Sequence, residues 1–167
     1  MADGTEEATE RFEVTRPVKA DRSTIFRLLC DPHGHVTIDS SGMLMDATGE
    51  PVAAVGDSFV VHMDREALND RPMGRYDVIV TIATFVPDSE IAWTVAGVTR
   101  SSVGHVYGYR LEPDPQGTLV TSYYDWSAIS AELKETGIFP VLPEGALRAT
   151  LGILARTVED HNDTGAA

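Results

Sequence analysis

The sequence predicts a single α+β domain in which a curved antiparallel sheet of seven strands wraps around a long C-terminal helix. Three observations lead to this fold class. Residues 43–126 are rich in valine, isoleucine, threonine and aromatic residues, and turn segments divide them at short intervals. A strand-like segment and a capped helical segment come before this region. A long amphipathic segment follows it.

The first predicted strand covers Arg11–Val18, because residues of opposite character alternate along it and Pro17 marks an edge position or its end. A helix is expected over Arg22–Cys30, since Asp21 can cap the free amides of its first turn. The segment 31–35 contains proline and glycine, which end this helix and leave room for a second short one. The chain is therefore expected to pass from a strand into two short helices.

Six further strands are predicted between residues 43 and 126, separated by breaks that contain glycine, proline, asparagine, aspartate or serine. Strands joined by such short connections pair antiparallel, as in a meander. The third of these strands would extend roughly 40 Å at about 3.3 Å per residue, which favours a strongly curved sheet. The six expected strands are Met43–Asp46, Asp57–Met63, Gly74–Val86, Ile91–Val98, Gly104–Glu112 and Thr118–Trp126.

The last predicted element is a helix over Pro143–His161, which carries an apolar face at helical spacing. Gly152 interrupts it at a cost of about 1 kcal/mol relative to alanine, which indicates either close packing or space left for another group. One domain is thus expected over residues 11–161, with disordered polar tails at 1–10 and 162–167. The apolar face of the helix consists of Leu147, Leu151, Leu154 and Val158.

The composition narrows the class of partner. The chain carries 26 acidic and 13 basic side chains, a net charge of −13, so nucleic acids and anionic membrane surfaces would repel it. Its single cysteine, Cys30, excludes an intrachain disulfide and is predicted to be buried as a small apolar group. No apolar stretch reaches the roughly 20 residues that span a bilayer, and the first ten residues are acidic. We expect a cytoplasmic protein without membrane insertion.

Several motifs in a fixed order resemble those of a known superfamily. The opening strand and helix carry Phe12-Glu13-Val14 and Ala20-Asp21-Arg22-Ser23-Thr24-Ile25-Phe26. The last hairpin carries Tyr109-Arg110-Leu111-Glu112-Pro113, Gly117-Thr118-Leu119-Val120-Thr121 and Tyr124-Asp125-Trp126-Ser127. Together they resemble the START-like helix-grip superfamily (SRPBCC), in particular its bacterial group of polyketide cyclase/dehydrase and lipid-transport proteins. The likeness extends over about residues 12–158 and implies a fold and a pocket. It does not imply one reaction, because members carry lipids, bind hormones or cyclise polyketides.

In a helix-grip fold the concave face of the sheet and the inner face of the last helix line a cavity, so strand alternation identifies candidate lining residues. The last strand is ambiguous, and we place Val120, Ser122 and Tyr124 inward. Aromatic side chains with polar tips suit both a filled core and a ligand pocket, and a buried phenol finds a partner more easily in the latter. The predicted ligand-binding residues are Phe59, Val61, Tyr76, Val78, Trp93, His105, Tyr107, Tyr109, Tyr124, Leu147, Leu151 and Leu154.

The histidines are the other candidate polar groups. His105 is expected on the inward face, as a hydrogen-bonding group of the pocket, an acid or base, or a core residue. His33 and His35 are expected near the pocket mouth, and His62 on the outer face. No carboxylate or cysteine completes a familiar zinc spacing with them, so neither a metal nor another cofactor is expected.

Two connecting segments stand out. The charged segment 65–72 is expected to be a solvated hairpin connection. The segment 138–143 is mostly apolar, and it is expected to cap the core, close the pocket or contact a second subunit. The second segment therefore leaves open an interaction module that forms a stable oligomer, and the chain is expected to be a monomer or a homodimer.

The leading functional hypothesis is binding or transport of a small lipophilic ligand of lipid, polyketide or isoprenoid type in the internal cavity. Burial of roughly 300 Å² of apolar ligand surface would contribute about 7 kcal/mol before the costs of association. The alternative is a polyketide aromatase/cyclase or dehydratase with His105 and Tyr107 as candidate catalytic groups. Whether a reaction occurs stays open, because no phosphate-binding loop, nucleophile elbow or carboxylate pair is recognisable.

Overall fold

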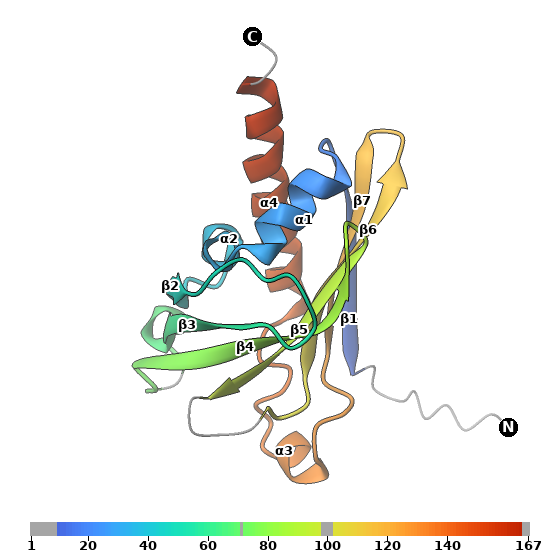
Figure 1. Ribbon diagram of the computed structural model, residues 1–167. Helices are drawn as coiled ribbons and strands as arrows, with labels where there is room; N and C mark the ends of the chain where they lie inside the picture. Colours follow the sequence, from blue (N-terminus) through green and yellow to red (C-terminus); the bar gives the residue numbers. More distant parts are fainter. Residues whose placement is uncertain (1–9, 71, 98–101, 165–167) are drawn as a thin grey trace, which may run out of the picture.

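The protein consists of a seven-stranded antiparallel sheet that curves around a long C-terminal helix (Figure 1). The computed structural model describes residues 10–70, 72–97 and 102–164. In chain order, the elements are β1 (Arg11–Val18), α1 (Arg22–Cys30), α2 (Pro32–Ile38), β2 (Leu44–Thr48), β3 (Ser58–Asp64), the 3₁₀ helix η1 (Arg65–Leu68), β4 (Arg75–Val86), β5 (Glu90–Gly97), β6 (Val106–Asp114), β7 (Gly117–Asp125), α3 (Ala131–Glu135) and α4 (Glu144–Thr164).

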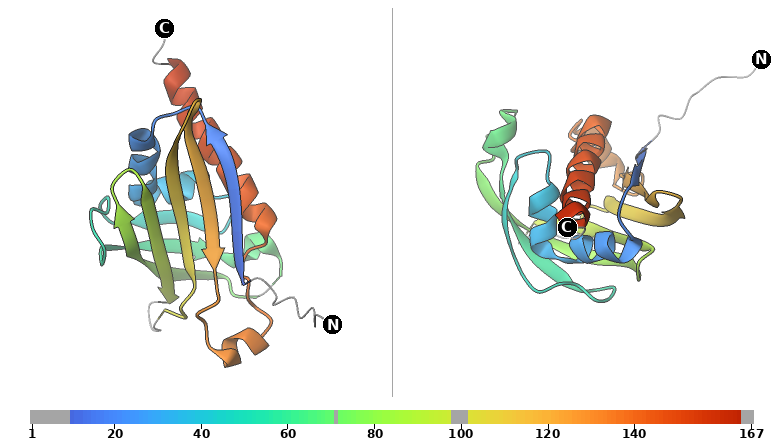
Figure 2. Two further views of the ribbon diagram at one scale, coloured as in Figure 1. Left: turned by 90° about the vertical axis from the view of Figure 1, so that its right-hand side faces the viewer. Right: turned by 90° about the horizontal axis from the view of Figure 1, so that it is seen from above.

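The strands lie in the order β1-β7-β6-β5-β4-β3-β2, and every neighbouring pair is antiparallel. Strands β2 to β7 follow one another as the predicted meander, and β1 joins the edge beside β7. From above, the sheet bends around α4, and α1 and α2 lie beside this helix (Figure 2). The predicted helix-grip architecture, an α+β fold with seven strands, two short early helices and a long last helix, is thus confirmed.

Local sequence accounts for the two early helices. The Asp21 carboxylate accepts a hydrogen bond from the Thr24 amide and caps α1, and the Asp31 carboxylate does the same for α2 through the His33 amide. Pro32 occupies the first turn of α2, where its missing N–H costs no helical hydrogen bond. These two start signals explain why α2 begins directly after α1 and extends over seven residues, as the predicted second short helix.

The end of α4 differs from the prediction. The helix continues three residues beyond His161, to Thr164, because no glycine or proline interrupts the chain before Gly165. The tail predicted at 162–167 is therefore helical as far as Thr164. Residues 165–167 lie outside the described residues, as do residues 1–9 of the predicted N-terminal tail and Val98 at the end of a predicted strand.

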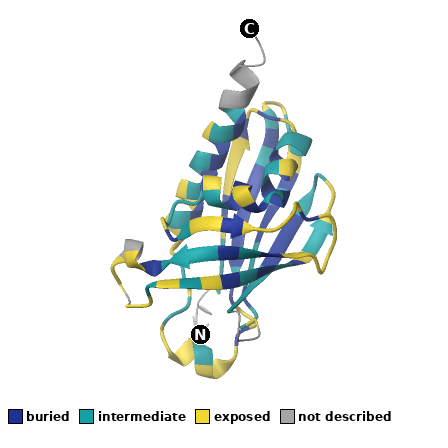
Figure 3. Ribbon diagram, turned by 60° about the vertical axis from the view of Figure 1, so that its left-hand side comes forward, coloured by how far each residue is buried: buried dark blue, intermediate teal, exposed yellow. Residues whose placement is uncertain are grey.

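The core fills the space between the concave face of the sheet and α4, and buried and exposed residues alternate along the strands in Figure 3. The predicted apolar face of α4 is buried throughout. Gly152 does not have the predicted close packing, because a Cβ there would meet only Arg16 Nη1, at 3.7 Å. That separation is an ordinary contact, so the helix approaches no backbone closely at this position.

The ambiguous last strand, β7, is oriented as predicted. Ser122 and Tyr124 face the interior, whereas the Tyr123 ring lies on the outer face beneath the guanidinium of Arg11, 4.4 Å away. The Tyr123 hydroxyl donates a hydrogen bond to Glu90 at 2.6 Å. Successive side chains of β7 thus lie on opposite faces of the sheet.

Candidate functional site

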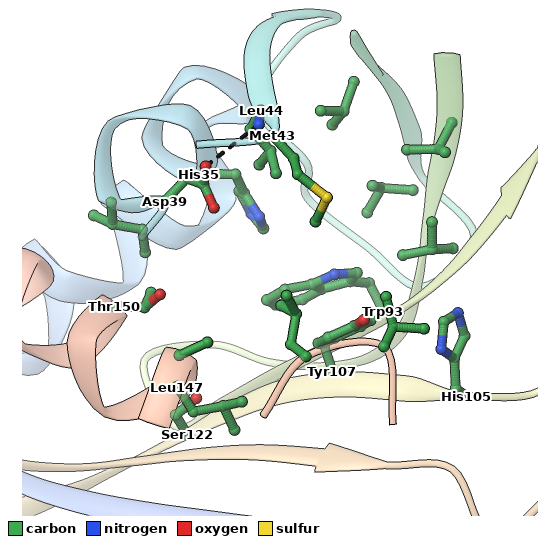
Figure 4. A pocket seen from close by; sticks show the side chains of 18 of the residues that line it. His35, Asp39, Met43, Leu44, Trp93, His105, Tyr107, Ser122, Leu147 and Thr150 are labelled. Carbon is green, nitrogen blue, oxygen red and sulfur yellow. Dashed lines mark hydrogen bonds between the residues drawn. The ribbon is translucent and has the colours of Figure 1, made fainter. Parts of the chain in front are cut away.

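A pocket of about 220 Å³ lies between the concave face of the sheet, α2 and the N-terminal half of α4 (Figure 4). Strands β3 to β7 form its floor, α2 and the segment after it form one wall, and α4 with the segment before it forms the other. Most of the lining side chains are apolar or aromatic. The volume lies below the roughly 300–1,000 Å³ typical of pockets for drug-sized molecules, so it matches a compact ligand.

Most of the predicted ligand-binding residues line this pocket, but some do not. Phe59, Tyr124, Leu151 and Leu154 are buried in the surrounding core instead. The reason is that strand and helix periodicity identify which face a residue occupies, and not how deep it lies beneath its neighbours. The predicted residues that do line the pocket are Val61, Tyr76, Val78, Trp93, His105, Tyr107, Tyr109 and Leu147.

The two walls of the pocket are only partly predicted by the sequence. A short second helix and a position of His35 near the pocket mouth are expected, and the spacing of His35 and Ile38 places both on one face of that helix, α2. The apolar segment at 138–143 does reach the pocket, through Val141 and Leu142. The lining residues absent from the predicted set are His35, Ile38, Asp39, Met43, Leu44, Met63, Val80, Val95, Gly108, Ser122, Val141, Leu142, Ala146, Thr150 and Tyr123, although the Tyr123 ring itself lies on the outer face of the sheet.

A row of aromatic rings crosses the floor of the pocket from strand to strand. The sheet register places Trp93 of β5 opposite Tyr107 of β6, and Tyr107 opposite Tyr124 of β7. The Tyr107 and Tyr124 rings stack with their centroids 4.2 Å apart, and Trp93 stacks on Tyr107 at 6.2 Å. Cross-strand aromatic pairs of this kind stabilise a sheet and give it a rigid surface. Tyr107 thereby covers Tyr124 and excludes it from the pocket.

His105 takes part in a hydrogen-bond network with this row. Its Nδ1 lies 2.7 Å from the Tyr124 hydroxyl, and the Val95 carbonyl accepts a hydrogen bond from the same ring. A carbonyl only accepts, so a neutral imidazole donates to Val95 and accepts the Tyr124 hydroxyl proton at Nδ1. The Tyr124 hydroxyl is in turn hydrogen-bonded to Tyr107. The network therefore runs from Tyr107 through Tyr124 and His105 to β5.

Burial sets the protonation states of this network. It lowers the pKa of His105 to about 4, so the ring is neutral at pH 7. It raises the pKa of Tyr107 well above its usual value, and also that of Tyr124. The pKa of Tyr109 is raised to about 12 by burial, although a hydrogen bond from Ser122 partly opposes this. All four groups are uncharged near neutral pH.

His35 is the polar group on the α2 wall. Its side chain is buried, and its Nε2 lies 2.8 Å from the Leu29 carbonyl of α1. The ring packs edge-on against Trp93 at 4.7 Å and against Phe59 at 5.1 Å, and it points from α2 toward Trp93 in Figure 4. Burial lowers the pKa of His35, so this ring is also neutral at pH 7. His33, two residues earlier, is exposed, and His62 is half-exposed on the outer face of the sheet, as expected.

The loop after α2 holds the two walls together. The Ser40 hydroxyl donates to the Ala146 carbonyl at 2.9 Å and lies 2.8 Å from Thr150 Oγ1, which joins this loop to α4. The neighbouring Asp39 carboxylate accepts hydrogen bonds at both oxygens, from Ser41 at one and from backbone amides at the other. Both oxygens of the Asp39 carboxylate at the pocket edge are thus occupied by hydrogen bonds within the loop.

Arg65 corrects the expectation that the charged segment 65–72 is solvated throughout. The residue is 6% exposed, and its Nε and Nη2 bind the two oxygens of Asp70 at 3.1 and 2.8 Å. It also hydrogen-bonds to the pocket residue Tyr76. A buried arginine with a bidentate carboxylate partner is favourable where an unpaired one would not be, and the sequence alone does not reveal this pairing.

Metal sites and membrane-spanning helices are two further features that bear on function. Within residues 10–70, 72–97 and 102–164, no three histidine, cysteine, aspartate or glutamate side chains are grouped so as to hold a metal ion. None of the helices in these parts of the chain is both long and apolar enough to cross a membrane.

Solved structures share this architecture. A crystal structure of a protein from Nitrosomonas europaea matches with a TM-score of 0.66 at 14% identity, covering 94% of this chain and 99% of that one. An AHSA1-like protein from Aeromonas hydrophila matches with a TM-score of 0.58 at 13% identity, over 91% of this chain and 94% of that one. The Aha1 dimer from Colwellia psychrerythraea matches with a TM-score of 0.56 at 17% identity, over 89% and 96%.

At these identities the likeness establishes the class of fold alone. The chain has the helix-grip fold, which it shares with AHSA1-like proteins over most of its length. Neither a family model nor a curated protein sequence matches the chain. Function must therefore be argued from the pocket itself.

Proposed function

We propose that the protein binds or transports a small lipophilic ligand in the pocket between the sheet, α2 and α4. The observation that carries the proposal is the pocket itself, an apolar space of about 220 Å³ beside the Trp93 ring. Small-molecule sites in proteins are concave and mostly apolar, with a few polar groups that fix orientation. The group resembled in sequence, polyketide cyclase/dehydrase and lipid-transport proteins, supports ligands of lipid, polyketide or isoprenoid type.

Catalysis has less support than binding. The candidate groups His105 and Tyr107 both lie at the pocket, as a cyclase or dehydratase would require. However, His105 makes hydrogen bonds to Tyr124 and Val95, and its pKa, lowered by burial to about 4, makes it a weak base. The high pKa of the buried Tyr107 hydroxyl makes it a poor proton donor at neutral pH. We therefore propose a carrier or binding role in preference to acid–base chemistry.

The cellular location and the oligomeric state are supported by fewer observations. For location we propose the cytoplasm, in keeping with one buried, unpaired cysteine, Cys30. For assembly we propose a monomer or a homodimer, and the Aha1 dimer from Colwellia psychrerythraea supports the second.

Two measurements test the binding proposal. Native mass spectrometry of the purified protein should show a bound small molecule, and the uncharged naphthalene dye prodan should increase its fluorescence on titration. The variant Ala146→Phe places a ring in the pocket and should weaken dye binding at least tenfold, because Ala146 lines the pocket. The matched control is Ala149→Phe, one turn further along the exposed side of α4, which should bind the dye like the wild type.

Either of two results would contradict the proposal. The first is a crystal structure in which side chains fill the space beside Trp93. The second is equal dye binding by the wild type and Ala146→Phe, which would place the dye elsewhere on the protein.

A further inference from the structure

The side chains that line the pocket offer no cation to a ligand. Within the described chain, the lining residues include no lysine or arginine. The one acidic side chain among them is Asp39, whose charge contributes to the raised pKa of Tyr109 across the pocket. A ligand carboxylate in this pocket would lose its hydration, find no opposite charge and approach a like charge. The pocket therefore disfavours anions.

Arg65 is a buried cation next to a pocket-lining residue. It reaches the back of the pocket wall through its hydrogen bond to Tyr76. Its guanidinium already makes two hydrogen bonds to Asp70, and Arg65 itself does not line the pocket. A ligand anion would have to compete with this bidentate pair, so Arg65 is a poor anchor for a carboxylate.

The pocket does offer a hydrogen-bond acceptor, on His35. Since the Leu29 carbonyl can only accept, His35 Nε2 must carry the proton, which leaves Nδ1 with a free lone pair. No described group bonds to Nδ1. No fully buried side-chain nitrogen or oxygen in the described parts of the chain lacks a partner, so Nδ1 must reach open space. The space that His35 lines is the pocket.

We propose that the pocket selects an uncharged, compact cyclic ligand that carries a hydroxyl group, and that this hydroxyl donates a hydrogen bond to His35 Nδ1. The inference rests on the proposed binding function and names its ligand class. The ring of such a ligand lies against the apolar floor next to Trp93, where contact with an aromatic face contributes most to the binding energy. The His35 ring is fixed by Leu29, Trp93 and Phe59, so the acceptor is oriented before the ligand arrives.

Three probes of nearly the same shape test the inference by calorimetry at pH 7.5. They are 2-naphthol, which has a donor, 2-methoxynaphthalene, which has none, and 2-naphthoate, which is an anion. One neutral hydrogen bond corresponds to an affinity difference of about five- to tenfold, so 2-naphthol should exceed 2-methoxynaphthalene by that factor. 2-Naphthoate should bind at least about tenfold more weakly than 2-naphthol, because its charge is desolvated without a partner.

The variant His35→Phe keeps an aromatic ring against Trp93 and Phe59 but removes the acceptor. It should bind 2-naphthol and 2-methoxynaphthalene equally. The matched control is His33→Phe, the same change on the exposed side of α2, which should keep the wild-type preference. A second readout needs no variant: the ¹⁵N signal of His35 Nδ1 in the wild type should move with 2-naphthol and stay in place with 2-methoxynaphthalene.

The outcomes separate this inference from the proposed function. Equal binding of the two neutral probes by the wild type would leave the binding function intact and overturn the role of His35. If 2-naphthoate bound most tightly of the three probes, the proposal of an uncharged ligand would be overturned. Loss of 2-naphthoate binding in Arg65→Gln would then identify Arg65 as the anchor. Binding of none of the probes, together with no bound molecule by mass spectrometry, would overturn both proposals.

Discussion

The two halves of α4 face the same sheet but different surroundings. The N-terminal half lines the pocket with Ala146, Leu147 and Thr150. The C-terminal half presents Leu151, Leu154 and Val158 to a filled core beside β1. One continuous helical face thus covers both an open space and a closed one. The difference comes from what stands opposite: His35, Met43 and the hydrogen-bonded loop at Ser40 frame the pocket end.

The largest expected effect comes from removing a leucine at the filled end. Leu154→Ala should lower the free energy of unfolding by about 3–4 kcal/mol, because its side chain has no exposed surface and leaves a cavity. Leu147→Ala at the pocket end should cost only about 1–2 kcal/mol, since its side chain already borders open space. Urea unfolding of both variants measures the difference, and equal losses would show that the two halves are packed alike.

Lowering the pH should destabilise the pocket end of the protein, where the buried His35 and His105 lie. Because burial lowers the pKa of His105 to about 4 from 6.5, the unfolded chain binds more protons between these values. The neutral His105 ring makes its full contribution to the free energy of unfolding above about pH 6.5, and this contribution is lost as the pH falls toward 4. The loss is on the order of 3 kcal/mol.

The check on this pH dependence is His105→Gln, which can make both hydrogen bonds but does not titrate in this range. Unfolding free energies at pH 7 and 4.5 should fall less in this variant than in the wild type. Parallel falls in the two proteins would assign the acid sensitivity to other groups, of which His35, whose pKa burial also lowers, is the first candidate.

The position of α2 over the pocket depends on a glycine. A Cβ at Gly34 would overlap with the Leu28 carbonyl oxygen of α1, so the backbones of the two helices can approach this closely only because this residue is glycine. Gly34→Ala should cost about 1–3 kcal/mol and shift His35. Thermal unfolding measures the first effect, and dye affinity the second. An unchanged affinity would show that the wall tolerates movement of α2.

The smallest expected effect lies between the two halves of α4. Gly152→Ala should stabilise the protein by about 0.5–1 kcal/mol, because alanine favours the helix and its methyl group meets only Arg16 Nη1. A rise in the melting temperature would verify this. A fall would mean that the added methyl group does not fit beside Arg16 and that the filled end extends to this turn.

The same comparison explains how far sequence could predict this molecule. Alternation and helical spacing identified every strand, the face of β6 that carries His105, Tyr107 and Tyr109, and the inner face of α4. They could not identify depth, so Leu151 and Tyr124 were placed in the pocket although neighbours cover them. Short elements without buried residues, such as α3, leave no periodic pattern to detect.

The predicted site was incomplete for a related reason. The α2 wall depends on one contact of His35 with α1 and another of Ser40 with α4, and the second joins residues 106 positions apart. Periodicity within a segment carries no information about partners so distant in the chain. The acceptor role of His35 Nδ1 therefore follows only from the structure, in which His35 Nε2 donates to the Leu29 carbonyl.

The pairing of β1 with β7 has a consequence for how the chain assembles. Arg11 lies opposite Asp125, 114 residues later, so β1 has no partner until most of the chain has been synthesised. Such distant pairings slow folding, because a long loop must close before the two strands form any contact. Until then the edge of β7 and the apolar inner face stay open to other chains, which makes the newly made protein prone to aggregation.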